Sequence, residues 1–256
     1  PAALVPLIRG ARQVVLVGDH RQLPPTVISY RAENGGLRRS LFERMVEMGI
    51  EPYLLTKQYR MHPAISKFPN DQFYNSQLED GVSAANRTAP AGLLWPDWEN
   101  PVAFLPVKGG EVVSPDGTSR ENPTEVAWII RILDDFLDAG ELEKGDIGVI
   151  TPYAGQVRAI RHSMREALDD IEVRSVDGYQ GREKEVIIFS CVRSNDDGNI
   201  GFLSDPRRLN VALTRAKRGL IVIGDPDTLR SDPIWTNWLE YVRSRNFEAW
   251  HLLGMA

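Results

Sequence analysis

Polar side chains, several of them arginines, gather in five short segments of this sequence, each placed after an apolar run or within an arginine-rich stretch. The segments are Gly18-Asp-His-Arg-Gln22, Gln58-Tyr-Arg60, Thr151-Pro-Tyr153, Asp177-Gly-Tyr-Gln-Gly-Arg-Glu183 and residues 205–219. A guanidinium is planar, permanently charged and shaped to bind phosphate oxygens, so these arginines indicate an anionic ligand. Ligands of open α/β sheets bind at the carboxyl ends of the strands, and we expect the five segments to meet there.

Residues 205–219 are predicted to form one helix that carries a row of arginines. Asp205 is a suitable N-cap, Pro206 suits the first helical position, and Gly219 is expected to end the helix. Arg208 and Arg215 then lie along one side of it. A solvated basic face is the alternative, but the other polar segments favour a ligand-binding row. The opposite face is apolar and can pack on a sheet through Leu209, Ala212, Leu213 and Ala216.

The elements that must position these segments follow from the hydrophobic periodicity. Strands are predicted at residues 13–17, 53–56, 102–107, 147–150, 171–174, 185–192 and 220–223. Helices are predicted at residues 37–48, from Pro63 until Pro69 bends or ends the helix, and at 122–140, 155–168, 206–218 and 233–244. The alternation of strand and helix in the second half predicts an α/β fold with a parallel sheet. Residues 75–121 are predicted to form an irregular surface excursion.

The composition is that of a globular protein and excludes several classes. The 256 residues carry a net charge of −5, which argues against a dedicated basic nucleic-acid module but leaves room for a local positive groove. No apolar run of about 18 residues indicates a membrane span, and no secretory signal is visible. The single Cys191 lies in an apolar run and is expected to be an inert buried thiol. The chain starts without Met, so we expect a piece of a longer protein.

Two histidines and two tryptophans are weaker candidates for binding a metal ion or nucleic-acid bases than the five polar segments are for binding an anion. His20 and His62 have no further ligands at a zinc-like spacing, so we expect no metal at these residues. Trp95 and Trp98 lie in the irregular excursion and could stack on bases, but we favour ordinary packing for both. None of the four is included among the predicted site residues.

Four segments resemble, in their order along the chain, motifs III, IV, V and VI of superfamily I nucleic-acid helicases. They are Gly-Asp-His-Arg-Gln-Leu from residue 18, Gln-Tyr-Arg-Met-His-Pro from residue 58, Ser-Val-Asp-Gly-Tyr-Gln-Gly-Arg-Glu-Lys from residue 175, and Arg-Arg-Leu-Asn-Val-Ala-Leu-Thr-Arg-Ala-Lys from residue 207. Further segments at 68–74, 190–195 and 200–203 are similar to the regulator of nonsense transcripts. The chain therefore resembles the Upf-like branch, which also includes the senataxin-type and immunoglobulin mu-binding-type helicases.

This resemblance implies two RecA-like motor domains. Residues 1–50 would be the last part of the first, with motif III, and residues 51–256 would be the second, with motifs IV to VI and the excursion at 75–121. It also implies an ATP-dependent helicase or translocase that moves 5′ to 3′ on single-stranded RNA, in the cytoplasm or also the nucleus and away from membranes.

The parts of such a motor that bind magnesium are missing from this sequence. No Gly-x-x-x-x-Gly-Lys-Ser/Thr loop occurs in the 256 residues, and no magnesium box precedes Gln13. In the family both belong to the first motor domain, so magnesium and its ligands are assigned there. The isolated chain is therefore expected to be inactive.

The resemblance implies three residues that act on ATP. Arg60 and Arg215 would be arginine fingers that reach the γ-phosphate, and Gln22 would sense that phosphate or hydrogen-bond the attacking water. A structural salt bridge is the alternative role for either arginine, and a loop-stabilising amide is the alternative for Gln22.

Three further residues would hold the rest of the nucleotide. Tyr59 would stack on adenine, Glu183 would bind the ribose hydroxyls, and Gly181 would let the backbone come close. Core packing is the alternative role for Tyr59. For Glu183 the alternative is a surface ion pair with Lys184 or Arg182.

Single-stranded nucleic acid is the partner that the resemblance implies, bound by its backbone without sequence readout. The contacting residues would be Thr151, Pro152, Tyr153, Ser175, Val176 and Arg193, although ordinary structural roles remain open for each. A DNA helicase of the same branch is one alternative function, because no residue reveals whether a 2′-hydroxyl is bound. A nucleic-acid-binding scaffold that has lost the motor is another, and the presence of both finger arginines, Gln22 and Glu183 argues against it.

Overall fold

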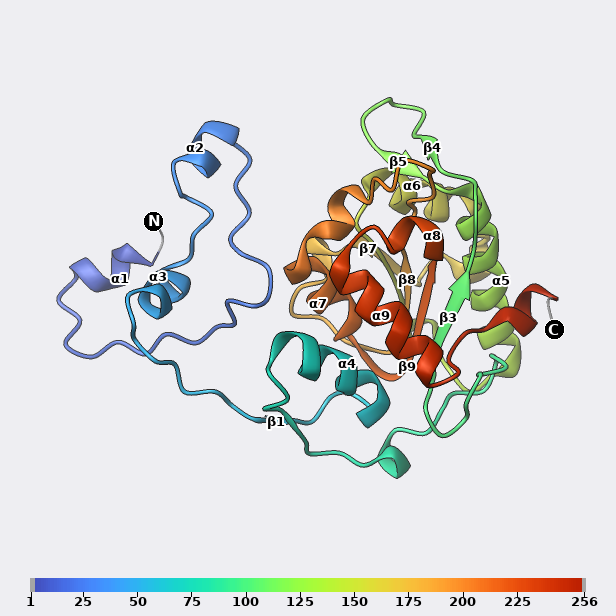
Figure 1. Ribbon diagram of the computed structural model, residues 1–256, viewed down its shortest axis with the longest axis horizontal. Helices are drawn as coiled ribbons and strands as arrows, with labels where there is room; N and C mark the ends of the chain where they lie inside the picture. Colours follow the sequence, from blue (N-terminus) through green and yellow to red (C-terminus); the bar gives the residue numbers. More distant parts are fainter. Residues whose placement is uncertain (1–2, 255–256) are drawn as a thin grey trace. The chain divides into compact units, whose positions relative to one another are not determined.

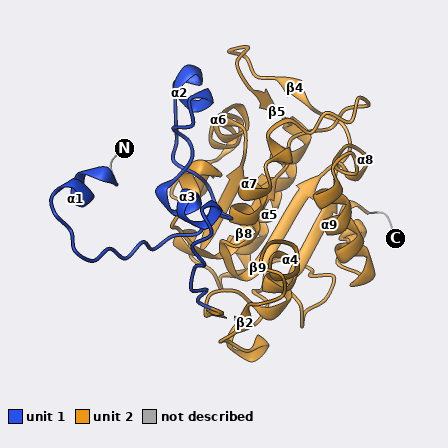
Figure 2. Cartoon of the chain, turned by 60° about the vertical axis from the view of Figure 1, so that its left-hand side comes forward, with its two compact units in different colours: residues 1–55 blue, residues 56–256 orange. Residues whose placement is uncertain are grey.

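The computed structural model describes residues 3–254, and the chain divides into two compact units, Pro1–Leu55 and Thr56–Ala256 (Figure 1; Figure 2). The described part of the first unit contains three short helices, α1 (Leu4–Ile8), α2 (Tyr30–Asn34) and α3 (Leu41–Glu47). The second unit contains a parallel sheet covered by helices. The assignment of the two units to two motor domains stays a prediction.

The strand predicted at residues 13–17 does not form, so that prediction is wrong. The apolar side chains of this run face solvent, with Val15 86% and Val17 90% exposed. A strand is stable only when its backbone pairs with a neighbouring strand, and the described residues of the first unit contain none that could pair with this run. The helix predicted at 37–48 is the shorter α3, because the Ser40 hydroxyl caps it by accepting a 3.0 Å hydrogen bond from the N–H of Glu43.

Five parallel strands form the sheet of the second unit, in the order β3-β9-β8-β6-β7. Their bounds are β3 Val102–Pro106, β6 Ile147–Thr151, β7 Glu172–Ser175, β8 Lys184–Ser190 and β9 Ala216–Gly224. Every neighbouring pair runs parallel, which confirms the predicted α/β fold with a parallel sheet flanked by helices. The strand predicted at 102–107 is β3, so the irregular excursion contributes one edge of the sheet.

Helices cover both faces of this sheet, which explains why its strands are apolar on both sides. On one face, α5 (Pro123–Ala139) and α6 (Ala154–Ser163) form a core with Ile221 and Ile223 of β9 and with residues of the other strands. On the other face, Trp235 stacks on Phe189 of β8 with their ring centroids 6.2 Å apart. That face is covered by α7 (Pro206–Leu213) and α9 (Pro233–Ser244), with α4 (Pro63–Phe73) packed against α9 (Figure 1).

Short elements complete the second unit. β1 (Lys57–Gln58) pairs with β2 (Glu79–Asp80), and β4 (Val112–Val113) pairs with β5 (Arg120–Glu121). The strand predicted at 53–56 is wrong, because Tyr53 is fully exposed and pairing begins only at β1. The remaining helical elements are α8 Pro226–Leu229 and the 3₁₀ turns η1 Ala84–Asn86, η2 Lys144–Asp146, η3 Glu166–Leu168, η4 Asp177–Tyr179, η5 Gly201–Ser204 and η6 Trp250–Leu253.

Local capping chemistry explains where several helices begin and end. Asn122 caps α5 by accepting hydrogen bonds from two backbone N–H groups, and Gly140 ends it with a positive φ of 70°, as the sequence predicts. The predicted bounds 233–244 are those of α9. Pro69 does not end α4, which continues to Phe73. The helix predicted at 155–168 was too long, since α6 ends at Ser163 and η3 follows.

The helix predicted at 205–219 is also too long, and this error changes the position of an arginine. α7 ends at Leu213, and β9 begins at Ala216 and pairs with β8. Gly219 therefore lies inside a strand, where a Cβ atom would come within 2.7 Å of the Trp95 ring. Arg215 lies at the turn between α7 and β9, because pairing with β8 overrides the helical periodicity that continues past Leu213.

The two tryptophans of the excursion differ in their surroundings. Trp95 is buried, and its indole N–H donates a 2.8 Å hydrogen bond to the carbonyl of Pro90, so the packing predicted for it is confirmed. Trp98 is 52% exposed and lies shortly before β3. None of the helices within residues 3–254 is long and apolar enough to cross a membrane.

Candidate functional site

Arg60 lies in a tight turn after β1 and joins two distant segments. The side-chain carbonyl of Gln58 accepts hydrogen bonds from the backbone N–H groups of Arg60 (3.0 Å) and Met61 (2.8 Å), which closes the turn. Nε of Arg60 donates to Glu183 over 2.6 Å, and Nη1 donates to the backbone carbonyl of Thr214 over 3.0 Å. Residues predicted to bind one nucleotide are thus brought together from three parts of the chain.

Arg215 follows Thr214 directly and is almost completely buried, with 2% of its surface exposed. Its Nε donates to the carbonyl of Val211 over 3.0 Å, and its Nη2 donates to the hydroxyl of Thr214 over 2.9 Å. That hydroxyl in turn donates to the carbonyl of Asn210 over 2.7 Å. The last turn of α7 therefore orients the guanidinium of Arg215, the residue that directly follows the Thr214 carbonyl bound by Arg60.

Glu183 forms ion pairs with two cations. It lies 2.6 Å from Nε of Arg60 and 3.5 Å from Nζ of Lys217. The hydrogen bond from Arg60 is the main cause of its lowered pKa, with the charge of Lys217 adding to the effect and burial opposing it. The pair with Lys184 or Arg182 considered from the sequence is not the pair that forms. Gly181 has a φ of +78°, a conformation that glycine adopts without steric cost, and the space around it is open.

Tyr59 presents its ring to solvent. The side chain is 63% exposed, which excludes core packing as its role. The ring lies over the backbone of Gly81, where a Cβ atom would come within 2.5 Å of a ring carbon. A planar aromatic group is thus held on a flat backbone support, ready to stack on another ring.

Arg87 binds the turn that carries Tyr59 and Arg60, a role that the sequence does not predict. Its Nε donates to the carbonyl of Arg60 over 2.9 Å, and its Nη2 donates to the carbonyl of Tyr59 over 3.1 Å. Arg87 and Gly81 both belong to the excursion, where no hydrophobic period indicates structure. The pairing of β1 with β2 brings this segment beneath Tyr59, and no pattern near residue 87 could have revealed it.

Gln22 lies in the first unit, and its surroundings are described within that unit. Its side-chain amide donates to one carboxylate oxygen of Asp19 over 2.9 Å, and the backbone N–H of Arg21 donates to the other over 2.9 Å. The Gln22 side chain is therefore oriented by its own loop. His20 stacks near Phe42, with 6.0 Å between the ring centroids.

The predicted nucleic-acid segments meet at the carboxyl ends of β6 and β7. Thr151 pairs in register with Ser175, and the N–H of Val176 donates to the carbonyl of Thr151 over 3.1 Å. The side chains of Thr151, Tyr153 and Val176 are buried, whereas Pro152 and Ser175 are half-buried. The backbone of these segments and the two half-buried side chains are the parts that are accessible to a nucleic-acid strand.

Arg193 is buried and bound to protein groups. Its Nε lies 3.0 Å from Glu111, and its Nη1 donates to Asn199 over 3.2 Å and to the hydroxyl of Tyr153 over 3.4 Å. A phosphate at this guanidinium would have to compete with the carboxylate of Glu111. Its proposed contact with a strand stays a prediction.

The turn before Arg193 is held by a buried acid. Val192 has a φ of +73°, which is unfavourable for a β-branched residue. Its backbone N–H donates to both carboxylate oxygens of Glu125 over 2.9 and 3.0 Å, and the Ser190 hydroxyl donates to one of them over 2.6 Å. Burial raises the pKa of Glu125 to about 8, although these hydrogen bonds oppose the change.

The polar segments do not all lie at one end of the sheet, and this part of the sequence analysis is wrong. Thr151 and Ser175 end β6 and β7, whereas Glu183 precedes β8 and Arg215 precedes β9. The crossover 177–183 and helix α7 both run back along the sheet. All strands of a parallel sheet begin at the same edge, so each connection must return from the carboxyl end of one strand to the amino end of the next. Thr151 and Ser175 therefore lie at the opposite end of the sheet from Glu183 and Arg215.

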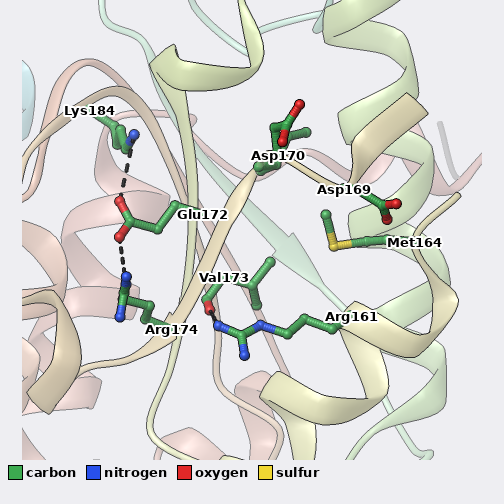
Figure 3. A pocket seen from close by; sticks show the side chains of 9 residues that line it. Arg161, Met164, Asp169, Asp170, Glu172, Val173, Arg174 and Lys184 are labelled. Carbon is green, nitrogen blue, oxygen red and sulfur yellow. Dashed lines mark hydrogen bonds and ion pairs between the residues drawn. The ribbon is translucent and has the colours of Figure 1, made fainter. Parts of the chain in front are cut away.

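A cavity of about 510 Å³ lies beside β7, and no predicted site residue lines it (Figure 3). Glu172 is bound there by Arg174 and by Lys184, and Arg161 donates to the carbonyl of Val173 over 2.6 Å. None of Arg60, Glu183 or Arg215 lines this cavity, so it is not the predicted nucleotide site.

No group of three or more His, Cys, Asp or Glu side chains within residues 3–254 could hold a metal ion. His62 acts as a helix cap, since its Nδ1 accepts a 3.0 Å hydrogen bond from the N–H of Ala64 at the start of α4. Burial lowers the pKa of His62, which favours the neutral ring that this bond requires.

Comparison with known proteins adds an independent finding. A family model described as an AAA domain matches residues 37–227, and a second model of the same description matches residues 1–30. The chain is 46% identical over 252 residues to the regulator of nonsense transcripts 1 homolog of Drosophila melanogaster, covering 96% of this chain and 21% of that protein. It is 44% identical over 253 residues to the ATP-dependent helicase NAM7 of Saccharomyces cerevisiae, covering 96% of this chain and 26% of that protein.

The chain thus spans only about a fifth to a quarter of the length of these relatives. Among solved structures, one titled "The structure of PRRSV helicase" matches 72% of this chain and 26% of its own, with 16% identity and a TM-score of 0.34. A likeness this low supports no argument about function.

Proposed function

Because the chain belongs to the AAA domain family, and because its relatives confirm the resemblance to Upf-like helicases, we propose that it is the C-terminal half of an ATP-dependent nucleic-acid helicase and translocase. The second unit is the second motor domain of this proposal, and the first unit is the last part of the first. The exposed apolar run around Val15 and Val17 supports the assignment of the first unit to the first motor domain. The run has the composition of a buried strand, which needs neighbouring strands to pair with.

ATP is the nucleotide, and residues of this chain bind part of it. Tyr59 offers an exposed ring for adenine, Glu183 a partly exposed carboxylate for the ribose, and Gly181 an open approach to the backbone. Arg60 and Arg215 are the arginine fingers, and their planar, charged groups suit phosphate oxygens. The hydrogen bond from Arg60 to the carbonyl of Thr214 is the observation that carries this proposal, because Thr214 directly precedes Arg215 and the bond therefore supports a shared role for the two arginines.

Gln22 and magnesium complete the catalytic side of the proposal. The amide of Gln22, oriented by Asp19, senses the γ-phosphate or positions the attacking water. Magnesium is held by residues of the first motor domain outside this sequence, because the 256 residues contain no P-loop to ligate it. The chain's own contribution is to position charged groups around the transferred phosphate.

The track is single-stranded nucleic acid, with RNA favoured over DNA and movement from 5′ to 3′. Its backbone runs past the carboxyl ends of β6 and β7, where Pro152, Ser175 and the surrounding peptide groups are within reach of phosphates. Thr151, Tyr153, Val176 and Arg193 support this surface from below. The cytoplasm is the proposed location, since the relatives are named for regulating nonsense transcripts.

Unwinding by the full-length protein tests this proposal. We expect ATP-dependent unwinding of a duplex with a 5′ single-stranded RNA overhang and none with a 3′ overhang. Stronger stimulation by single-stranded DNA would favour the DNA alternative, and ATP-independent binding without turnover would favour the scaffold. The isolated 256-residue chain should hydrolyse ATP negligibly. Turnover by this chain alone at the rate of a complete helicase would contradict the assignment of the P-loop and the magnesium ligands to the rest of the first motor domain.

A further inference from the structure

Phe202 is an exposed aromatic residue on a rigid support. Its side chain is 55% exposed, whereas Ile200 and Leu203 on either side are buried. The backbone N–H of Phe202 donates to the hydroxyl of Tyr153 over 3.2 Å, and the indole of Trp235 donates to the carbonyl of Leu203 over 3.0 Å. The ring therefore faces solvent from a fixed backbone.

Gly201 explains how the ring reaches this position. Its φ is +54°, and a Cβ atom there would lie 2.5 Å from the hydroxyl of Tyr153 and 2.3 Å from Nη1 of Arg193. Only glycine allows the chain to pass this close to both side chains. The turn is thus built so that the residue after Gly201 projects outward.

A guanidinium lies over the same ring. The Cζ atom of Arg208 is 5.2 Å from the ring centroid of Phe202, within the range of a cation–π contact. Arg208 also lies 3.4 Å from Asp177 and 3.7 Å from Asp205, which orients it. The ring of Tyr153 supports Phe202 from another side, with centroids 5.4 Å apart and planes inclined by 44°.

This aromatic–arginine pair lies beside the proposed strand track. Tyr153 follows β6 and Asp177 follows β7, so Phe202 and Arg208 contact residues at the carboxyl ends of both strands. Proteins that bind single strands without sequence preference combine basic groups for the phosphates with aromatic rings on which bases stack. Phe202 of η5 and Arg208 of α7 supply the two groups from consecutive elements of the chain.

We infer that Phe202 is a base-stacking site for single-stranded nucleic acid, with Arg208 placed to contact a neighbouring phosphate. This inference rests on the proposed strand track and adds to it a contact with the bases. An apolar docking site for a protein is the competing use of an exposed ring. The guanidinium of Arg208 over the ring favours nucleic acid, although a phosphate there would have to compete with the carboxylates of Asp177 and Asp205. A protein-docking surface would instead need a contiguous apolar patch.

Equilibrium binding of single-stranded RNA to the full-length protein tests the inference. Phe202→Ala should weaken binding by about 5- to 150-fold, the range measured for loss of one stacked base. Phe202→Leu keeps the apolar contact with Tyr153 but has no aromatic face, so it should weaken binding similarly. Phe202→Trp should bind as tightly as the natural protein.

An abasic strand of the same length separates stacking from other effects. Wild type and Phe202→Ala should bind this strand equally, since no base is available to stack. Trp98→Ala is the matched control, because Trp98 is also about half exposed, at 52%, but lies shortly before β3 at the amino ends of the strands. It should leave binding unchanged.

Two outcomes overturn the inference while the wild type still binds RNA and hydrolyses ATP. One is unchanged affinity of Phe202→Ala and Phe202→Leu for the base-containing strand. The other is an equal loss of affinity for the abasic strand. A wild-type protein that binds no single strand at all would instead overturn the proposed function, and this inference with it.

Discussion

Arg60 donates a 3.0 Å hydrogen bond to the backbone carbonyl of Thr214, the residue directly before Arg215. This contact ties the turn after β1 to the turn between α7 and β9. It depends on α7 ending at Leu213, since a helix continued to residue 218 would use that carbonyl internally. The local end of one helix therefore creates the cluster on which the proposed nucleotide chemistry depends.

Removing the guanidinium of Arg215 should abolish ATP turnover by the full-length protein. We expect Arg215→Ala to lower kcat by roughly 10³- to 10⁵-fold, the effect of losing an arginine finger. Arg215→Lys should also be severely impaired, because an ammonium lacks the planar fork. Steady-state ATP hydrolysis normalised to folded protein measures this effect.

Arg218→Ala serves as the matched control for that experiment. Arg218 lies in β9, shortly after Arg215, but donates to the carbonyl of Thr88 over 2.8 Å and pairs with Glu141. Its removal should leave kcat nearly unchanged. Normal turnover per folded molecule in Arg215→Ala, together with a lower Tm, would show that Arg215 is a structural residue.

Arg87 should affect nucleotide binding more than the chemical step. Its guanidinium holds the carbonyls of Tyr59 and Arg60, so Arg87→Ala should let this turn shift and raise the KM for ATP roughly tenfold, as expected for losing two hydrogen bonds to a charged donor. The kcat should fall less than in Arg215→Ala. Arg131→Ala, at an exposed arginine that lies over Trp128, should change neither constant. A loss confined to kcat would contradict a positioning role.

Glu125 should make stability depend on pH with an unusual sign. The pKa of Glu125 is about 8 in the folded protein, against 4.5 for an ordinary glutamate. Between these two pH values the folded state therefore keeps a proton on Glu125 that the unfolded state has lost. The contribution of Glu125 to stability is therefore present in full at low pH and is lost as pH rises through about 8, by up to roughly 1.4 kcal/mol per pH unit.

Glu125→Gln removes this titration while keeping an oxygen that can accept from Val192 and Ser190. The free energy of unfolding of the natural protein minus that of Glu125→Gln should decline between pH 5 and 8. Chemical denaturation at several pH values measures the difference. A difference that stays constant between pH 5 and 8 would mean that Glu125 is already ionised in the folded protein.

Gly219 should tolerate no side chain. A Cβ atom at this position meets the Trp95 ring at 2.7 Å, so Gly219→Ala should lower the free energy of unfolding by roughly 1–3 kcal/mol. Gly145→Ala is the control, because nothing lies within 4 Å of a Cβ atom there. Equal stabilities of the two variants in denaturant unfolding would refute this account of the Gly219–Trp95 contact.

Local signals were sufficient for much of the fold. The bounds of α5 were predicted closely, because its first and last residues are set by the cap at Asn122 and the left-handed Gly140, which act only on their immediate neighbours. The apolar runs that became β6 and β8 were predicted for the same reason, since a buried parallel strand is apolar on both faces. The runs at 13–17 and 53–56 look alike in sequence, yet neither forms a strand, because a strand also needs a partner.

The residue types that are available to bind a nucleotide, and the bounds of helices such as α5 and α9, can be predicted from the sequence, because both depend on short stretches of chain. Only the tertiary structure decided that α7 stops at Leu213, that Arg87 supports Tyr59, and that the polar segments do not all lie at one end of the sheet. Each of these features depends on contacts between residues far apart in the chain. The pairing of β9 with β8 is the main one, because its hydrogen bonds outweigh the helical preference of the segment that it interrupts.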